Sequence, residues 1–281
     1  MESDLKGRVV LITGASGGIG RALARAFGAE GARLALVAGR RREELARFTA
    51  EQPWAERALV LAADLERPEP IATAFAEAEK RLGPVEIAIA NAGVWPREDR
   101  LLHEAAEERI LRTVTVNLLG AIWTARAFMA ALDRQRDRVE RPALLLIGST
   151  AGRFGEAGHA DYAAAKAGLR GLAASLKNEL VRIVPGARVN VIEPGWTVTE
   201  LARPELETPG RVARALATVP LRRLGRADEI ARAAVFLASP RLSPHVTGEV
   251  LTVAGGMEGR LLWDPSTIDE QRVREEAGGS P

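Results

Sequence analysis

A tyrosine and a lysine four residues apart, Tyr162 and Lys166, have types and a spacing that suggest proton chemistry. On a helix, residues at i and i+4 project from the same face, so the ammonium would lie beside the phenol. The ordinary pKa of tyrosine is about 10, which is too high for easy proton exchange near neutral pH. A neighbouring ammonium favours the tyrosinate and lowers that pKa. The pair is therefore a candidate general acid/base, although most such pairs are ordinary contacts on a helix surface.

A glycine-rich run, Thr13-Gly14-Ala15-Ser16-Gly17-Gly18-Ile19-Gly20, lies between an apolar strand pattern and an amphipathic helix pattern. Glycines let the backbone turn tightly and let a pyrophosphate approach closely, and the helix N-terminus offers free N–H groups. The alternative is a tight strand-to-helix turn, but the position of the run in the chain favours a phosphate site. The run predicts dinucleotide contacts from Gly14, Ser16, Gly17, Gly18, Ile19 and Gly20.

The residues after the second expected strand should face the ribose of the adenosine. A carboxylate there would bind the 2′-OH of NAD, whereas an arginine accommodates the 2′-phosphate of NADP. The sequence has Gly39-Arg40-Arg41 at this point and no acid. We therefore expect Arg40 to be a cofactor contact and NADP(H) to be favoured over NAD(H), unless the arginines simply begin a surface helix.

These residues must be positioned by elements that alternate along the chain, with short aliphatic runs followed by helix-period segments. The expected strands are Arg8–Thr13, Arg33–Val37, Ala58–Ala62, Val85–Ala90, Ala143–Gly148, Arg188–Ile192 and Glu249–Val253. The expected helices lie near 19–30, 42–50, 69–82, 102–136, 161–184 and 227–238. Strands that are nearly continuous apolar runs are typical of a parallel sheet covered on both faces. The pattern predicts an α/β fold, a Rossmann-type doubly wound sheet of about seven mainly parallel strands with helices on both faces.

The chain contains no linker rich in Pro, Gly or Ser that would divide it, so we expect a single NAD(P)-binding domain over residues 1–257. Prolines and a glycine interrupt the pattern within residues 196–220, which predicts a mobile substrate loop with a short helix. Residues 258–281 turn charged and end in Gly-Gly-Ser-Pro, so we expect a C-terminal extension that is partly disordered.

The glycine spacing TGxxxGxG and the motifs that follow it resemble the short-chain dehydrogenase/reductase family. The matching segments occur in the family's order, and they are Asp64-Leu65, Asn91-Ala92-Gly93, Asn117 within VNLLG, Ser149, YAAAK from Tyr162 to Lys166, Pro194-Gly195 with Thr197 and Thr199, and the run RLGRADEIARAAVFLAS. The resemblance covers roughly residues 5–257. The ordered set is more specific than any of its motifs, each of which could occur by chance.

The resemblance implies a hydride transfer between nicotinamide and a carbonyl or secondary alcohol, with Tyr162 as the general acid/base. Lys166 would lower the pKa of the tyrosine and bind the nicotinamide ribose. Ser149 would donate to the substrate oxygen, and Asn117 would hold a water that links Lys166 to solvent. The remaining cofactor contacts implied by the family are Asp64, Leu65, Asn91, Ala92, Gly93, Tyr162, Lys166, Pro194, Gly195, Thr197 and Thr199.

Four features depart from the family's usual pattern. Gly148 stands where a serine is frequent, and Ala254 stands where an aspartate is frequent. The stretch Asp133–Arg141 is unusually charged, and the chain after Met257 is longer than in many relatives. None of these changes removes a catalytic group.

Three aromatic side chains, Trp95, Phe154 and Trp196, belong to segments expected to wall the substrate pocket. They predict an apolar pocket for a hydrophobic or ring-bearing ketone or alcohol, unless some of them pack against the loop instead. A 3-oxoacyl thioester is another candidate substrate, because the sequence also resembles the reductases of that subfamily. Small residues on the helices near 112–130 and 161–180 predict a homo-oligomer, a tetramer or a dimer.

The composition excludes several other classes of protein. The chain of 281 residues has no cysteine, and its three histidines are far apart, so we expect no disulfide and no metal site. No signal peptide is apparent, and no apolar run approaches the roughly 18 residues of a membrane span, so we expect a cytoplasmic protein without a membrane partner. Arginine alternates with acids outside Arg40–Arg42, which argues against a nucleic-acid partner.

A hydrolase with a Ser-His-Asp triad is not favoured, because Ser149 is not in a GxSxG turn. The main alternative to an active oxidoreductase is a catalytically silent dinucleotide-binding protein that acts as a sensor or scaffold. The complete set of Asn117, Ser149, Tyr162 and Lys166 argues against it. An arginine-rich nucleic-acid binder is a third and weaker alternative, and it would show strongly salt-dependent binding.

Overall fold

Successive side chains of strand β1 (Val9–Thr13) point to opposite faces of the sheet, and both faces are buried. Val9 and Leu11 belong to one core cluster, whereas Val10 and Ile12 belong to the other, and none of the four is exposed. A strand that is buried on both faces must lie in the middle layer of three. The continuous apolar runs of the sequence therefore form a central sheet, as predicted.

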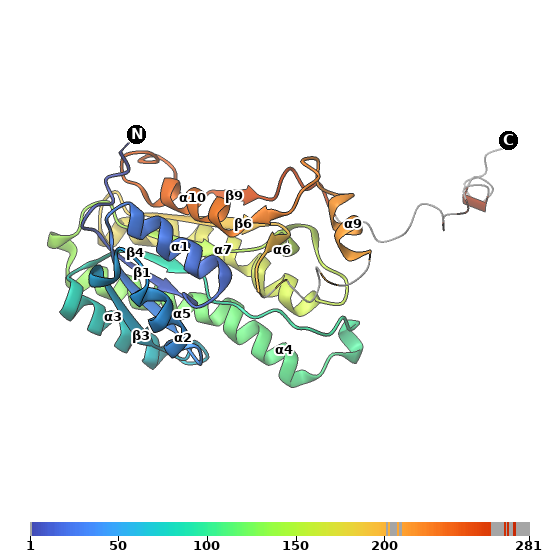
Figure 1. Ribbon diagram of the computed structural model, residues 1–281, viewed down its shortest axis with the longest axis horizontal. Coiled ribbons are helices and arrows are strands. Elements are labelled where there is room, and N and C mark those ends of the chain that lie inside the picture. Colours follow the sequence, from blue (N-terminus) through green and yellow to red (C-terminus); the bar gives the residue numbers. More distant parts are fainter. Residues whose placement is uncertain are drawn as a thin grey trace.

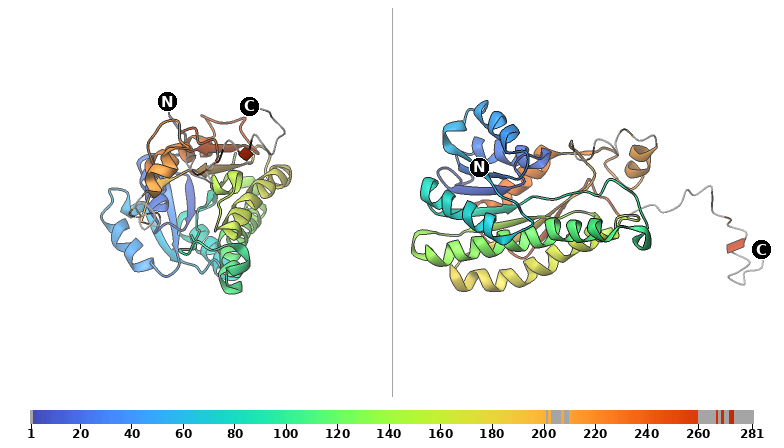
Figure 2. Two further views of the ribbon diagram at one scale, coloured as in Figure 1. Left: turned by 90° about the vertical axis from the view of Figure 1, so that its right-hand side faces the viewer. Right: turned by 90° about the horizontal axis from the view of Figure 1, so that it is seen from below.

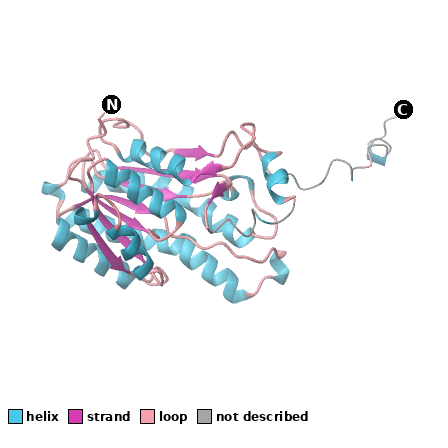
Figure 3. Cartoon of the chain, viewed as in Figure 1, coloured by secondary structure: helices cyan, strands magenta, loops and turns pink. Residues whose placement is uncertain are grey.

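The computed structural model describes residues 2–200, 202, 207, 210–259, 267, 269, 272 and 273. Its main sheet has seven parallel strands, in the spatial order β3-β2-β1-β4-β5-β6-β9 (Figures 1 and 3). The strands after β1 are β2 (Arg33–Ala38), β3 (Ala58–Ala62), β4 (Val85–Ala90), β5 (Ala143–Ile147), β6 (Arg188–Pro194) and β9 (Val250–Val253). The strand order reverses between β1 and β4, and ligands of such sheets bind beyond the carboxyl ends of the strands at this point.

Helices cover both faces of the sheet. The core cluster on one face includes residues from α1 (Gly18–Ala29), α2 (Arg42–Ala50) and α10 (Ala227–Ala238). The cluster on the other face includes residues from α3 (Pro68–Leu82), α5 (Gly120–Arg134) and α7 (Ala160–Ile183). In Figure 2 the green segment that ends in α5 and the yellow helix α7 run side by side along this second face. The doubly wound arrangement predicted from the sequence is therefore confirmed.

The helix expected near 102–136 is divided in the structure. A 3₁₀ turn (Leu102–Glu104) comes first, α4 (Glu107–Val114) follows, and a π-helical turn (Thr115–Leu119) joins α4 to α5. Within the described residues, the continuous stretch Glu107–Arg134 is long and apolar enough to cross a membrane by length and composition alone. Part of this stretch, including Ala121, Ala125 and Phe128, is buried in the core of the domain.

Smaller elements lie around the carboxyl edge of the sheet. They are α6 (Ala151–Phe154), α9 (Arg211–Leu216) and a second sheet of β7 (Thr197–Val198) with β8 (Gly225–Arg226). The short helix expected within residues 196–220 is present as α9, while 201, 203–206, 208 and 209 lie outside the described residues. The predicted disorder of the extension 258–281 also falls mostly on residues outside the described part of the chain.

Arg188 connects the sheet to the end of α10. Its guanidinium is buried and donates to the carbonyl oxygens of Leu237, Ala238 and Ser239 and to Oγ of Ser243. Those carbonyls have no partner within the helix, because the last turn of a helix leaves its acceptors unsatisfied. Burial, with smaller contributions from Arg8 and Arg141, lowers the pKa of Arg188 to about 10, so it remains charged at neutral pH.

We expect the substitution Arg188→Met to lower the free energy of unfolding by about 2–4 kcal/mol. It removes the donor to the buried oxygen of Ala238 and leaves the oxygens of Leu237 and Ser239 with Ser243 as donor. Thermal unfolding followed by circular dichroism measures this loss. The matched control is Arg232→Met on α10, the helix whose end Arg188 binds, because the ion pair of Arg232 with Asp228 is exposed. A control that loses as much stability as Arg188→Met would contradict the assigned role of Arg188.

Candidate active site

A cleft of about 790 Å³ lies beyond the carboxyl ends of the central strands. Segments from the first to the last third of the chain line it, which parallel strands permit because their carboxyl ends meet at one edge. The sequence-predicted residues that line it are Gly14, Ser16, Gly17, Gly18, Ile19, Gly20, Arg40, Asp64, Leu65, Asn91, Ala92, Gly93, Trp95, Asn117, Ser149, Tyr162, Lys166, Pro194, Gly195, Trp196, Thr197 and Thr199. Phe154 is the one predicted site residue that does not.

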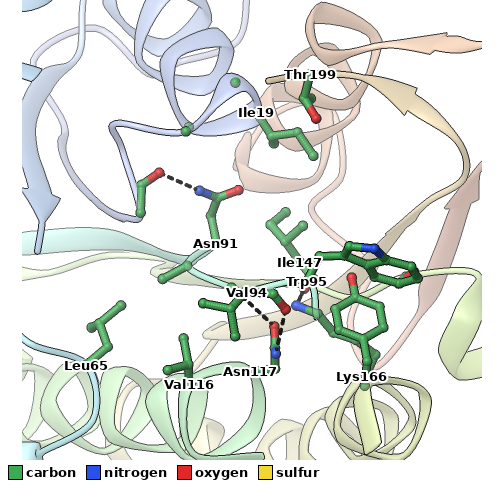
Figure 4. A pocket seen from close by; sticks show the side chains of 18 of the residues that line it. Ile19, Leu65, Asn91, Val94, Trp95, Val116, Asn117, Ile147, Lys166 and Thr199 are labelled. Carbon is green, nitrogen blue, oxygen red and sulfur yellow. Dashed lines mark hydrogen bonds between the residues drawn. The ribbon is translucent and has the colours of Figure 1, made fainter. Parts of the chain in front are cut away.

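One end of the cleft is formed by the turn between β1 and α1. Gly14 has φ of 63°, and a Cβ at this position would lie 2.6 Å from Cα of Ala92, so no other residue fits there. The side chain of Asn91 donates to the backbone oxygens of Thr13 and Gly14 and fixes the turn to the end of β4 (Figure 4). The first residues of α1 follow at once, so this end of the cleft fits the pyrophosphate of a dinucleotide.

Two arginines follow β2 at the adjoining wall of the cleft. Arg40 and Arg41 both line it, and Asp64 and Leu65 line it from the neighbouring segment after β3. Nη1 of Arg41 lies 3.2 Å from Oε2 of Glu200, and both side chains are about half exposed. The sequence analysis singled out Arg40 alone, although the second cation was visible beside it.

Lys166 projects into the middle of the cleft from the second turn of α7. Only 4% of the residue is exposed, and its Nζ donates to the backbone oxygen of Ile147 over 2.9 Å (Figure 4). Burial lowers the pKa of this ammonium to about 8. The Nζ atom lies 5.8 Å from the centre of the Tyr162 ring, so the phenol and the ammonium share one face of the helix, as their spacing predicts.

Asn117 lies in the π-helical turn and is almost completely buried. Its Nδ2 donates to the backbone oxygens of Val94 and Thr113, both over 2.9 Å, and its Oδ1 accepts from the Val94 N–H. The amide therefore joins the segment after β4 to the long helix. Single π turns inside α-helices are frequent at functional sites.

Ser149 follows β5 and faces the same part of the cleft. Its Oγ accepts a hydrogen bond from the N–H of Ala151 over 3.1 Å, which leaves the hydroxyl proton available for donation. On the opposite side of the cleft, Thr197 donates to the backbone oxygen of Gly195 and so stabilises the bend after β6.

Two of the three predicted pocket aromatics, Trp95 and Trp196, line the cleft. The Trp95 ring is in edge contact with Tyr162, at 4.8 Å between centroids, and is stacked on His159 at 4.0 Å. Phe154, at the end of α6, does not line this cleft, and the guanidinium of Arg153 lies over its ring at 5.1 Å.

Comparison with known proteins shows relatives that match the chain from the phosphate-binding turn almost to the end of the described residues. The family model described as "Enoyl-(Acyl carrier protein) reductase" matches residues 14–258. The 3-oxoacyl-[acyl-carrier-protein] reductase of Bos taurus is 36% identical over 89% of this chain and 98% of its own length. The corresponding FabG enzyme of Escherichia coli (strain K12) is 36% identical over 90% of this chain and 98% of its own.

Solved structures show the same relationship. A short-chain dehydrogenase/reductase from Brucella melitensis, named glucose/ribitol dehydrogenase, superimposes with a TM-score of 0.82 at 30% identity over 92% of this chain and 99% of its own. A putative gluconate dehydrogenase from Agrobacterium tumefaciens gives 0.83 at 28% identity over 92% of this chain and 98% of its own. The chain belongs to the short-chain dehydrogenase/reductase family and is an NAD(P)-dependent oxidoreductase that interconverts a carbonyl group and an alcohol.

Proposed function

We propose that the protein is an NADP(H)-dependent carbonyl reductase in which Tyr162 is the general acid/base. The observation that carries this proposal is the buried Lys166 ammonium, 5.8 Å from the Tyr162 ring centre, in the same cleft as the glycine turn. The relatives named as enzymes favour an active protein over the silent sensor or scaffold. A silent protein would bind the cofactor without turning over any carbonyl in a broad panel.

The proposed reaction divides between a bound nicotinamide and the side chains around it. When bound, the nicotinamide supplies the hydride that reaches the carbonyl carbon. The phenol of Tyr162 gives its proton to the carbonyl oxygen, while the free hydroxyl proton of Ser149 donates a hydrogen bond to the same oxygen. In the reverse direction the tyrosinate takes the proton of the alcohol, so the protons balance.

Lys166 and Asn117 support this proton transfer through their hydrogen-bonding groups. The ammonium has three donors, and the oxygen of Ile147 accepts one of them, so the others remain for the ribose hydroxyls of the cofactor. Both N–H groups of the Asn117 amide are bound to the backbone, but its Oδ1 retains a second lone pair. We assign to that oxygen the water that links Lys166 to solvent.

The proposed substrate is a 3-oxoacyl thioester or another carbonyl compound with an apolar chain or ring. The curated relatives are named for a 3-oxoacyl substrate, whereas the family model is named for an enoyl reductase. Two hydroxyl donors that line one cleft, those of Ser149 and Tyr162, suit a carbonyl oxygen better than a carbon–carbon double bond. Trp95 and Trp196 supply apolar surface next to them.

The preference for NADP(H) is proposed from the two arginines at the adenosine end of the cleft. A phosphate accepts charge-assisted hydrogen bonds from a guanidinium. Arg40 and Arg41 both line the cleft. Arg41 forms an exposed ion pair with Glu200, and a bound phosphate would replace the carboxylate of Glu200 in that pair. The remaining predicted cofactor contacts keep the roles that the family resemblance implies.

We further propose the setting in which this enzyme works. Residues 1–257 would form one domain and 258–281 an extension, and the protein would be cytoplasmic, with neither membrane nor nucleic acid as partner. A homotetramer or dimer through α4, α5 and α7 is the proposed assembly. Leu111 of α4 and Val181 of α7 are large apolar side chains that this single chain leaves exposed, which supports it.

Replacing Tyr162 with phenylalanine removes only the hydroxyl. We expect kcat for the reduction of ethyl acetoacetate or 1-tetralone by NADPH to fall by about 10²- to 10⁴-fold, the usual contribution of a general acid. The affinity for NADPH, measured by quenching of the five tryptophans, should not change. Retained turnover would refute the role of Tyr162, and loss of NADPH binding would point to a damaged fold instead.

Three consecutive arginines allow a matched test of cofactor preference. We expect Arg40→Ala and Arg41→Ala each to weaken NADPH binding by roughly tenfold and to leave NADH binding unchanged, because each removes a donor to the 2′-phosphate. Arg42 is exposed at the start of α2 and does not line the cleft, so Arg42→Ala is the control. Preference of the wild-type protein for NADH would overturn this part of the proposal.

A further inference from the structure

One guanidinium outside the predicted site, that of Arg109 on α4, holds together three segments around Tyr162. Its Nη1 donates to the backbone oxygen of Glu98, and its Nη2 donates to that of Gly158, both over 2.8 Å. Nε and Nη2 also donate to the two carboxylate oxygens of Asp161, over 3.3 and 3.1 Å. Asp161 immediately precedes Tyr162 in the first turn of α7.

The ion pair is shielded from solvent. The side chain of Asp161 is 1% exposed and that of Arg109 is 16% exposed. An arginine fork that binds a carboxylate through two nitrogens restricts both position and orientation, which a lysine cannot do. Any displacement of Asp161 must therefore move Tyr162, because the two residues are consecutive in one helical turn.

The segment after β4 and the turn before α7 are joined at further points. Nε2 of His159 lies 3.0 Å from the backbone oxygen of Pro96, and the N–H of Arg100 donates to the oxygen of Gly158 over 3.2 Å. Gly158 has φ of 79°, and a Cβ there would lie 1.7 Å from Oδ1 of Asp99. The turn before α7 therefore packs directly against the segment after β4, with no room for a side chain at position 158.

We propose that Arg109 and Asp161 form a positioning pair for the acid/base step. The pair holds Tyr162 in place, and its two opposite charges cancel, so that no net charge is buried beside the phenol. This inference rests on the proposed function, because it assumes that the phenol of Tyr162 ionises during the reaction. Among the described residues, further charged or titratable groups near Tyr162 include Lys166 on its own helix, His159 before it and Glu156 on the cleft wall.

The pair has two separable consequences. Its charges cancel at Tyr162, so the loss of one partner leaves an uncompensated charge close to the phenol. An unpaired Asp161 disfavours the tyrosinate, whereas an unpaired Arg109 favours it. Its hydrogen bonds fix geometry, and only a guanidinium can make all four of them.

The sequence offers a direct measurement, because Tyr162 is the only tyrosine in the chain. The absorbance of tyrosinate near 295 nm therefore reports the ionisation of Tyr162 alone, without any substrate. We expect Arg109→Gln to raise the pH of half-ionisation and Asp161→Asn to lower it, each by about half to one pH unit. The double variant, which has neither charge, should return to about the wild-type value.

A second measurement separates geometry from charge. Arg109→Lys keeps the cation but not the fork, so it should titrate like the wild type while its kcat for ethyl acetoacetate falls by about tenfold. The double variant should also stay slow, and NADPH binding should be unchanged in every variant. The matched control is Arg134→Gln at the end of α5, which breaks an ion pair with Glu79 far from the cleft. It should change neither the pH of half-ionisation nor kcat.

The outcomes are distinguishable. Shifts of the two single variants in the same direction, or no shift in either, would overturn the positioning pair. If Arg109→Gln fails to fold because Asp161 is left unpaired, Asp161→Asn and the double variant still decide the sign. An inactive wild-type protein, or an active Tyr162→Phe variant, would instead refute the proposed function and leave the titration result standing as a structural fact.

Discussion

The burial of the Lys166 ammonium is the interaction on which the arrangement of the site depends. Removing a cation from water is costly unless hydrogen-bond acceptors replace the lost solvent, and the lowered pKa of about 8 expresses that cost. Among the described residues no carboxylate forms an ion pair with Lys166, and the backbone oxygen of Ile147 accepts its hydrogen bond. An ammonium held in this way retains donors for a polar ligand. Asn117 and Gly93 pack closely beside it, since a Cβ on Gly93 would lie 2.7 Å from Oδ1 of Asn117 and 3.4 Å from Nζ of Lys166.

The sequence predicted the sheet well, because strands buried on both faces are continuous apolar runs, and each of the seven was found within two residues of its expected ends. It also predicted which residues would meet, because parallel strands bring their carboxyl ends to one edge. The π turn at Asn117 and the division of the helix expected near 102–136 could not be predicted, since neither changes the helical period enough to be seen. Contacts between side chains far apart in the chain, such as Arg109 with Asp161, have no periodic signal at all. The position of Phe154 outside the cleft likewise had no signal in the sequence.

Departures from the family pattern have local physical explanations. A Cβ at position 148 would lie 3.0 Å from Cγ of Glu193, whose carboxylate is fully buried and bound by both Nε and Nη2 of Arg170 over 2.6 Å. A serine in place of Gly148 would therefore compete for space with that ion pair. A Cβ on Gly195 would lie only 2.7 Å from Cβ of Ala254, so the bend after β6 requires glycine where it packs against position 254.

The position of Tyr162 is restricted from three directions by three parts of the chain. Lys166 lies one turn further along α7, Trp95 contacts the ring from the segment after β4, and Asp161 ties the first turn of α7 to α4. Trp95 keeps this position although its Nε1 is buried without a hydrogen-bond partner. It is the only such side-chain atom in the part of the chain described. An unsatisfied buried donor costs about 1–3 kcal/mol, so stacking on His159 and edge contact with Tyr162 must outweigh that cost. The indole thereby covers one side of the phenol with apolar surface, and excluding water there strengthens the electrostatic effect of every charge that faces it.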